Sequence, residues 1–232
     1  MLIKTAIDSL THLFFPHICA GCGSDVINKN QLLCLACTDR LPLTNYYAHA
    51  DNPVEKTFWG RIPLNHATSY LYFNKDSIVQ QLMHQFKYKG NQEIGLYFGK
   101  KMGSAISSAP RFQTPDFLVP LPLHPQRQKK RGYNQAEVLC RGMAESMGIP
   151  VLEQAVSRTM QTETQTHKNR ESRWQNMEGK FVLKHPSLIE NKHVILVDDV
   201  ITTGATLEAC GLELLKARGL LLSIATLAYT SV

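Results

Sequence analysis

The sequence contains no long apolar run. Nowhere in its 232 residues is there a stretch close to the ~20 consecutive apolar residues that a membrane-spanning helix requires. The N-terminal stretch lacks the small-residue cleavage site of a secretory signal peptide, and Asp8 interrupts what would be its apolar centre. We therefore expect a cytoplasmic protein that does not insert into a membrane.

The composition shows no strong bias. Charged residues make up 19% of the chain and hydrophobic residues 44%, which is ordinary for a soluble globular protein. The formal net charge is +6. A positive balance permits partners that carry phosphate, either a nucleic acid or a pyrophosphate, without distinguishing between them, and solvated surface lysines alone could also produce it. The chain is long enough for one α/β domain and a small additional unit.

Four of the six cysteines form two Cys-x-x-Cys pairs, namely Cys19, Cys22, Cys34 and Cys37. Two such pairs about a dozen residues apart have the spacing of a four-cysteine metal site, in which the thiolates surround a zinc ion and leave no position for water. Disulfides or a redox-active pair are the alternatives, but nothing indicates an oxidising compartment. The pattern predicts a structural Zn²⁺.

The first 45 residues are expected to form a unit of their own. Apolar side chains recur at spacings of three and four over residues 2–15, which is typical of an amphipathic helix. This helix and the cysteine knuckle would form a subdomain over residues 1–45, and residues 46–232 would form the main domain. For the polar connector over residues 38–66 the sequence indicates no function.

The most informative stretch runs from His193 to Thr206 and reads HVILVDDVITTGAT. Its apolar, β-branched beginning predicts a buried strand that ends at Asp198 and Asp199, and a helix pattern begins at about Ala205. Backbone N–H groups at a helix N-terminus favour phosphate, and carboxylates accept hydrogen bonds from ribose hydroxyls or hold hydrated Mg²⁺. The arrangement therefore suits a phosphorylated sugar.

This stretch resembles the 5-phosphoribosyl-1-pyrophosphate (PRPP) motif of type I phosphoribosyltransferases. The resemblance makes Asp198 and Asp199 the catalytic candidates, and it assigns PRPP binding to Ile201, Thr202, Thr203, Gly204, Ala205 and Thr206. An ordinary strand–turn–helix corner with polar capping residues is the alternative. The apolar pattern continues as a helix to near Gly219 and a strand over residues 220–229, which predicts a βαβ unit and a parallel sheet flanked by helices.

A basic stretch follows an earlier predicted strand, Phe117–Val119. Its prolines predict an irregular loop, and Asn134 is positioned to cap the next helix. Because arginine binds phosphate oxygens through two parallel hydrogen bonds, we expect this loop to bind pyrophosphate. The candidates are Leu123, His124, Arg127 and Arg131. A solvated basic turn is the alternative, and it is the better interpretation of the intervening lysines.

Three further elements are predicted between the knuckle and this strand. Alternating residues over 68–73 predict a strand, and a helix starting at Asn74 or Ser77 would run through Phe86. Residues 96–106 predict another helix, interrupted at Gly99 and Gly103.

Taken in order, the motifs resemble the ComF/GntX family of phosphoribosyltransferase-like proteins, which is associated with natural competence and the use of external DNA. The resemblance rests on the four-cysteine knuckle, FKYKG at 86–90, PLHP followed by RGYNQA at 131–136, and the PRPP motif. It implies a type I phosphoribosyltransferase fold with PRPP and Mg²⁺ as ligands. It also implies single-stranded DNA, a DNA-import helicase or other competence proteins as partners.

The resemblance places a mobile loop over the active site within residues 156–181. Its cations, which would neutralise the departing pyrophosphate, are Lys168, Arg170 and Arg173. A disordered surface loop is the alternative.

One residue departs from the pattern of a related group. Enzymes resembling the hypoxanthine–guanine phosphoribosyltransferases have an aspartate, the candidate general base, where this chain has Thr202. The motif therefore contains no visible base. Three hypotheses stay open: an active phosphoribosyltransferase or PRPP hydrolase with an unknown acceptor, a non-catalytic accessory protein that binds PRPP or single-stranded DNA, and a PRPP-sensing regulator.

Overall fold

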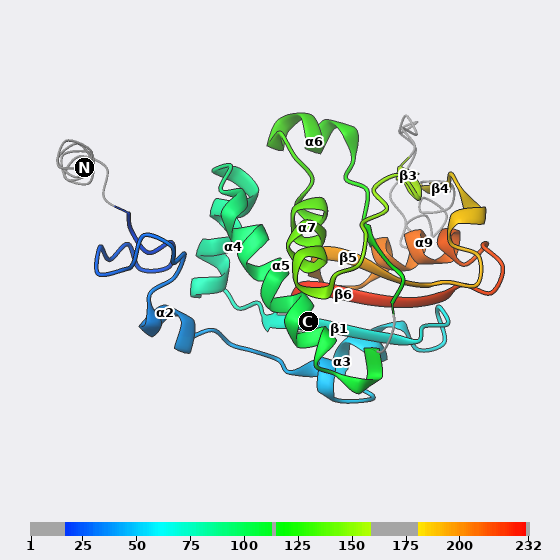
Figure 1. The fold of residues 1–232 in the computed structure, drawn as a ribbon, viewed down its shortest axis with the longest axis horizontal. Helices are drawn as coiled ribbons and strands as arrows, with labels where there is room; N and C mark the ends of the chain where they lie inside the picture. The colour runs from blue at the N-terminus through cyan, green and yellow to red at the C-terminus, as the bar shows by residue number, and fades with distance from the viewer. Residues whose placement is uncertain (1–16, 113–114, 159–180, 231–232) are drawn as a thin grey trace, which may run out of the picture.

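A parallel sheet of four strands forms the centre of the protein (Figure 1). The computed structural model describes residues 17–112, 115–158 and 181–230. The order across the sheet is β1-β6-β5-β2, and each neighbouring pair is parallel. The strands are β1 (His66–Tyr72), β2 (Phe117–Pro120), β5 (His193–Ile201) and β6 (Leu221–Tyr229).

Each face of the sheet is covered by its own apolar cluster. On one face, side chains of β5 and β6 pack with α4 (Ile78–Tyr88), α5 (Gln92–Ser107) and α7 (Gln135–Met147). On the other face they pack with α3 (Pro53–Phe58) and α9 (Ala205–Leu214). Burial on both faces explains why β5 begins with an unbroken apolar run, since parallel sheets are covered on both sides.

Shorter elements complete the described chain. An antiparallel pair, β3 (Val156–Arg158) and β4 (Phe181–Leu183), lies beside α9. The remaining helical segments are α2 (Leu35–Asp39), η1 (Tyr46–Ala48), η2 (Pro110–Phe112), α6 (Pro125–Arg131) and η3 (Pro186–Leu188). Among the helices of the described ranges, none combines the length and the apolar character that crossing a bilayer requires.

The expected interruption of the helix at Gly99 and Gly103 is wrong. Helix α5 runs continuously from Gln92 to Ser107. The two glycines instead allow α5 and α7 to approach closely, because a Cβ on Gly99 would overlap the carbonyl oxygen of Leu139, and one on Gly142 of α7 would overlap that of Leu96. Glycine is used here for backbone contact between helices rather than as a break.

Three other features also differ from the sequence-based expectations. The predicted irregular loop after β2 contains the helix α6, which begins at Pro125, a first-turn position where the missing N–H costs nothing. Strand β5 does not end at Asp198 but continues to Ile201, which pairs with Tyr229 of β6. The helix that was predicted to end near Gly219 ends earlier, at Leu214.

The other predicted elements are confirmed. Strand β1 occupies residues 66–72, and Ser77 caps α4 by accepting a hydrogen bond from the Gln80 N–H. Asn134 caps α7 in the same way through the Ala136 N–H. The predicted βαβ unit is formed by β5, α9 and β6. The predicted N-terminal helix over residues 2–15 lies outside the described residues.

Candidate functional site

Two carboxylates lie near the carboxyl end of β5. Successive side chains of a strand point to opposite faces of the sheet, so Asp198 and Asp199 diverge. The Asp199 N–H donates to Asp198 Oδ1 at 2.7 Å, and the Asp199 carboxylate forms an ion pair with Lys87 Nζ at 2.9 Å. Ligands of open parallel sheets bind outside the carboxyl ends of the strands, which is where this pair is located.

Cations from three elements lie close enough to the acids to affect them electrostatically. Lys87 comes from the last turn of α4, Arg131 from the end of α6, and Arg158 from the end of β3. Arg131 donates to Gln135 Oε1 at 2.7 Å, and its guanidinium lies 5.5 Å from the ring centre of Tyr88. Positive charge of this kind, held on separate elements, suits a ligand that carries more than one phosphate.

Burial and neighbouring charges shift pKa values in the site. Burial, and then the neighbouring Asp199 carboxylate, raise the pKa of Asp198 to about 8, although Lys87 and Arg131 act in the opposite direction. Burial and the nearby Arg127 lower the pKa of Arg158, whereas Asp198 opposes that effect. In the free protein, the Asp198 carboxyl therefore loses its proton less readily than a solvated carboxyl does. It lies beside cations that a phosphorylated ligand would reach.

The phosphate-loop candidates follow directly after β5. Ile201 is buried at the strand end, Thr202 and Thr203 are exposed, and Gly204 adopts a positive φ of 72° as the N-cap of α9. Ala205 and Thr206 form the first turn of α9. No side chain caps this helix, so its first N–H groups are left for another acceptor. The alternative interpretation, in which polar side chains of the turn cap this helix, therefore does not describe the structure.

The pyrophosphate candidates lie on the neighbouring strand connection. The Leu121 N–H donates to Val197 O at 2.9 Å, which continues the β2–β5 pairing and places the following residues beside the acids. Leu123 is partly buried, and His124 caps α6 by accepting from the Gln126 N–H at 3.3 Å. Arg127 is exposed on α6 and Arg131 is partly buried at its end. The predicted lid cations Lys168, Arg170 and Arg173 lie outside the described residues.

Sequence reasoning did not assign Lys87 and Arg158 to the acidic pair. Lys87 belongs to the FKYKG motif, which was used at the sequence level only as part of the family resemblance. Its ion pair with Asp199 depends on how α4 packs on the sheet, and no local pattern encodes that contact.

The four knuckle cysteines converge. Their sulfur atoms all lie within 4.8 Å of one another, and Cys22 Sγ and Cys34 Sγ are 3.8 Å apart. A tetrahedral ion with metal–sulfur bonds of about 2.3 Å places its ligands about 3.8 Å apart, so the cluster fits zinc. Although burial opposes it, N–H groups of Cys34, Cys22 and Gly21 lower the pKa of the Cys19 thiol to about 6. The thiols of Cys140 and Cys210 are buried elsewhere.

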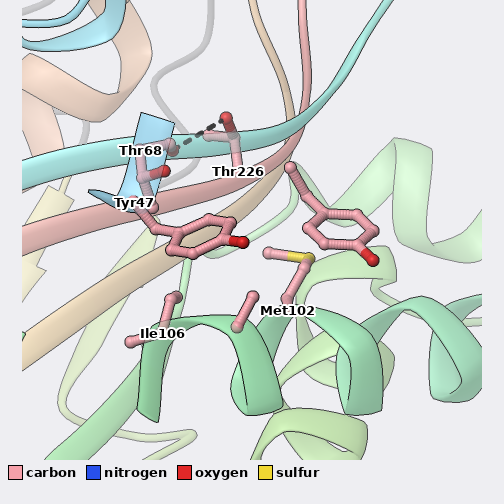
Figure 2. A pocket seen from close by; sticks show the side chains of 7 residues that line it. Tyr47, Thr68, Met102, Ile106 and Thr226 are labelled. Carbon is pink, nitrogen blue, oxygen red and sulfur yellow. Dashed lines mark hydrogen bonds between the residues drawn. The ribbon is translucent and has the colours of Figure 1, made fainter. Parts of the chain in front are cut away.

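A small pocket is lined mainly by residues of α5, β1 and β6. Figure 2 shows it between helix α5 and the sheet, with Met102 and Ile106 on one side and Tyr47, Thr68 and Thr226 on the other. Its lining is mainly apolar and contains no charged residue. It therefore offers no recognition for a phosphorylated ligand.

Comparisons with known proteins agree with this geometry. A family model described as "Phosphoribosyl transferase domain" matches residues 130–231. Competence protein F of Haemophilus influenzae is 31% identical over 203 residues, which cover 84% of this chain and 83% of that protein. The chain belongs to the ComF family. Its fold is the phosphoribosyltransferase type: a parallel sheet flanked by helices, with a cysteine cluster compatible with a zinc knuckle.

Other relatives match less of this ComF-family chain. The DNA utilization protein YhgH of Salmonella typhimurium is 33% identical over 138 residues, which cover 58% of this chain and 60% of that protein. Among solved structures, glutamine phosphoribosylpyrophosphate amidotransferase from B. subtilis is 18% identical, covers 61% of this chain and 30% of that one, and superposes with a TM-score of 0.40. A score this low supports no residue-by-residue comparison.

We predict that Asp198→Asn stabilises the free protein. The native pKa of Asp198, about 8, is above its unfolded value, so the native state binds this proton more tightly and the free energy of unfolding falls as the pH rises from about 4 to about 8. Asparagine keeps the acceptor for the Asp199 N–H but carries no charge. Thermal unfolding at pH 8 should show a Tm gain of at least about 2–4 °C, corresponding to ~1 kcal/mol in a chain of this size.

The gain in Tm should be smaller at pH 5, where the wild-type carboxyl is largely protonated. An equal gain at both pH values would show that packing rather than charge is responsible.

Proposed function

We propose that this ComF-family protein binds PRPP at the carboxyl end of β5. One observation carries the proposal: the acidic pair of β5 is followed within a few residues by a helix N-terminus without a side-chain cap. The N–H groups of Gly204 to Thr206 would receive the 5′-phosphate, with the exposed hydroxyls of Thr202 and Thr203 as further donors. Asp198 and Asp199 would accept from the ribose hydroxyls.

The pyrophosphate of PRPP would lie towards the segment after β2. Leu123 and His124 leave the sheet beside the acids, and Arg127 and Arg131 follow on α6. Mg²⁺ fits the oxygen donors of Asp198 and Asp199 and would neutralise charge on the pyrophosphate. Lys87, already paired with Asp199, would be released towards the same phosphates when the ligand competes for it.

If the protein is an enzyme, a nitrogen nucleophile would form a bond to C1 of the ribose while the C1–O bond to pyrophosphate breaks. Pyrophosphate would leave with the electron pair. The contribution of the protein would be positioning and stabilisation of the departing charge. With Thr202 at the position of the expected base, a sensor that binds PRPP without turning it over stays the alternative to catalysis.

We also propose that the four-cysteine cluster binds one structural zinc ion. Leu33 and Cys37 of the knuckle are buried in the same apolar cluster as Val79 and Leu82 of α4. The metal would thus hold together a segment with little core of its own and fix how it packs on α4.

A second candidate function is binding of single-stranded DNA near the same site. Helix α6 presents Arg127, Lys129 and Lys130 to solvent, and Tyr88 is 60% exposed beside Arg131. Cations beside an exposed aromatic ring suit a single strand, because phosphates pair with the cations and bases stack on the ring. A DNA-import helicase or another competence protein as partner rests on the family resemblance alone.

Calorimetry with PRPP and Mg²⁺ tests the main proposal. Wild-type protein should bind, and Asp198→Asn combined with Asp199→Asn should weaken binding by at least about tenfold, since each lost charge-assisted hydrogen bond is worth ~1.5–3 kcal/mol. Asp116→Asn is the matched control, because Asp116 pairs with Lys192 and the His193 N–H at the opposite end of β5. Unchanged binding by the double variant would refute the site.

Release of pyrophosphate across a panel of nitrogen bases would then distinguish an enzyme from a sensor.

Metal analysis tests the zinc proposal. Freshly reduced protein should contain one zinc ion per chain, and Cys22→Ser should lose it. A chelator should increase hydrogen exchange over residues 17–45 more than over β5 and β6, because the metal organises only the knuckle. Cys140→Ala and Cys210→Ala, at buried thiols outside the cluster, should retain the metal. Wild-type protein without zinc would contradict the assignment.

Single-strand binding should depend on both salt and Tyr88. We expect Tyr88→Ala to weaken binding of an oligonucleotide by about fivefold or more, given ~1–3 kcal/mol per stacked base. Lys129→Ala/Lys130→Ala should reduce the slope of log affinity against log salt by roughly one for each phosphate that the variant no longer neutralises. Trp59→Ala is the control, since Trp59 at the end of α3 is also an exposed ring, 58% exposed, beside a lysine, Lys56. Binding that does not respond to salt, or an equal loss in Trp59→Ala, would exclude this surface.

A further inference from the structure

The segment from Thr57 to Ile62 runs behind the proposed phosphate loop. Thr57 and Phe58 lie against Gly204, where an added Cβ would come within 3.0 Å and 2.9 Å of them. Ile62 contacts the second turn of α9, since a Cβ on Gly211 would be 2.6 Å from its Cδ1. Both glycines thus allow this segment to pack against the loop and helix. It belongs to the connector to which the sequence assigned no role, and it precedes the part of the chain that the family model matches.

Arg61 joins this segment to the loop through hydrogen bonds to three groups. Its Nη1 donates to Thr57 O at 2.9 Å and to Thr203 O at 3.0 Å. Its Nη2 forms an ion pair with Glu208 Oε2. The side chain of Glu208 is only 8% exposed and that of Arg61 26%, so the pair is largely shielded from water.

We propose that Arg61 is a positioning residue for the 5′-phosphate. The C=O and N–H of a trans peptide point in opposite directions. By holding the Thr203 carbonyl behind the loop, Arg61 therefore directs the N–H of Gly204 forward, towards the proposed phosphate site. Glycine has more backbone freedom than other residues. The peptide group between Thr203 and Gly204 therefore needs a hydrogen bond from another segment to stay in one orientation.

Arg61 also balances a charge that opposes the ligand. Glu208 lies in the first turn of α9 and is buried, so its negative charge is close to the helix end that would bind phosphate. A buried carboxylate without its cation would repel an anionic ligand at that helix end and weaken the effect of the helix dipole. The ion pair removes this repulsion without placing a cation in the site itself.

Binding of two partial ligands tests the role of Arg61. Arg61→Ala should weaken binding of ribose 5-phosphate by about tenfold, the sum expected from one charged hydrogen bond and one uncompensated charge at a helix end. Binding of magnesium pyrophosphate, which would contact the α6 side of the site, should stay within about twofold of wild type. A general loss of structure would reduce both affinities together, and that result would overturn the proposal.

Three further variants separate charge from position. Arg61→Ala/Glu208→Gln should regain about threefold of the lost ribose 5-phosphate affinity, because the uncompensated charge is gone while the Thr203 carbonyl stays unheld. Arg61→Lys should fall between wild type and Arg61→Ala, since lysine keeps the charge but cannot fork between Thr203 and Glu208. Arg111→Ala is the matched control: Arg111 pairs with Glu55 at 2.8 Å with similar burial, and its loss should leave ribose 5-phosphate affinity unchanged.

The inference rests on the proposed binding of a 5′-phosphate, and the two fail in different ways. Wild-type protein that does not bind ribose 5-phosphate or PRPP would overturn the proposed function. Wild-type protein that binds, with equal binding by Arg61→Ala, would overturn only the role of Arg61.

Discussion

The parallel pairing of β5 between β6 and β2 is the interaction on which the rest of the molecule depends. Residues Val194 to Val197 are fully buried, so they anchor the strand in the centre of the sheet. Once that register is set, Asp198 lies opposite Thr226 and the Leu121 N–H meets Val197 O. The acids, the segment after β2 and the N-terminus of α9 therefore reach one edge of the sheet together, although the segment after β2 is far from the other two in sequence.

The charges at this edge balance one another across the fold. Two adjacent acids in a largely buried place repel each other. Lys87, Arg131 and Arg158, from three separate elements, supply positive charge that offsets this repulsion. None of these cations sits on the strand that carries the acids. Such a site is expected to be costly for stability in the free protein and to gain from a ligand that supplies its own phosphate and metal charges. The cysteine knuckle contributes at a distance, by packing on α4, the helix that carries Lys87.

Much of the fold was predictable because its signals are local. The apolar run of β5, the caps Ser77 and Asn134, and the spacing of the cysteines each depend on residues close in sequence. The errors arose where one residue type serves two purposes. Gly99 looked like a helix break but provides contact with α7, and Pro125 looked like part of a loop but occupies the first turn of α6. The use of Gly99 depends on the neighbouring helix α7, whereas that of Pro125 is local, since proline is tolerated in the first turn of a helix.

The amino-acid pattern was sufficient to single out the acidic pair, the candidate phosphate loop and the cysteine knuckle, because each is contiguous or regularly spaced and its proposed chemistry follows from the residue types. The partners of these groups required the folded chain. Lys87 reaches Asp199 from a helix in the first half of the sequence, and Arg61 reaches Thr203 across 142 positions. Contacts at such separations arise from helix packing and strand order, and these depend on the balance of the whole core rather than on any local sequence signal.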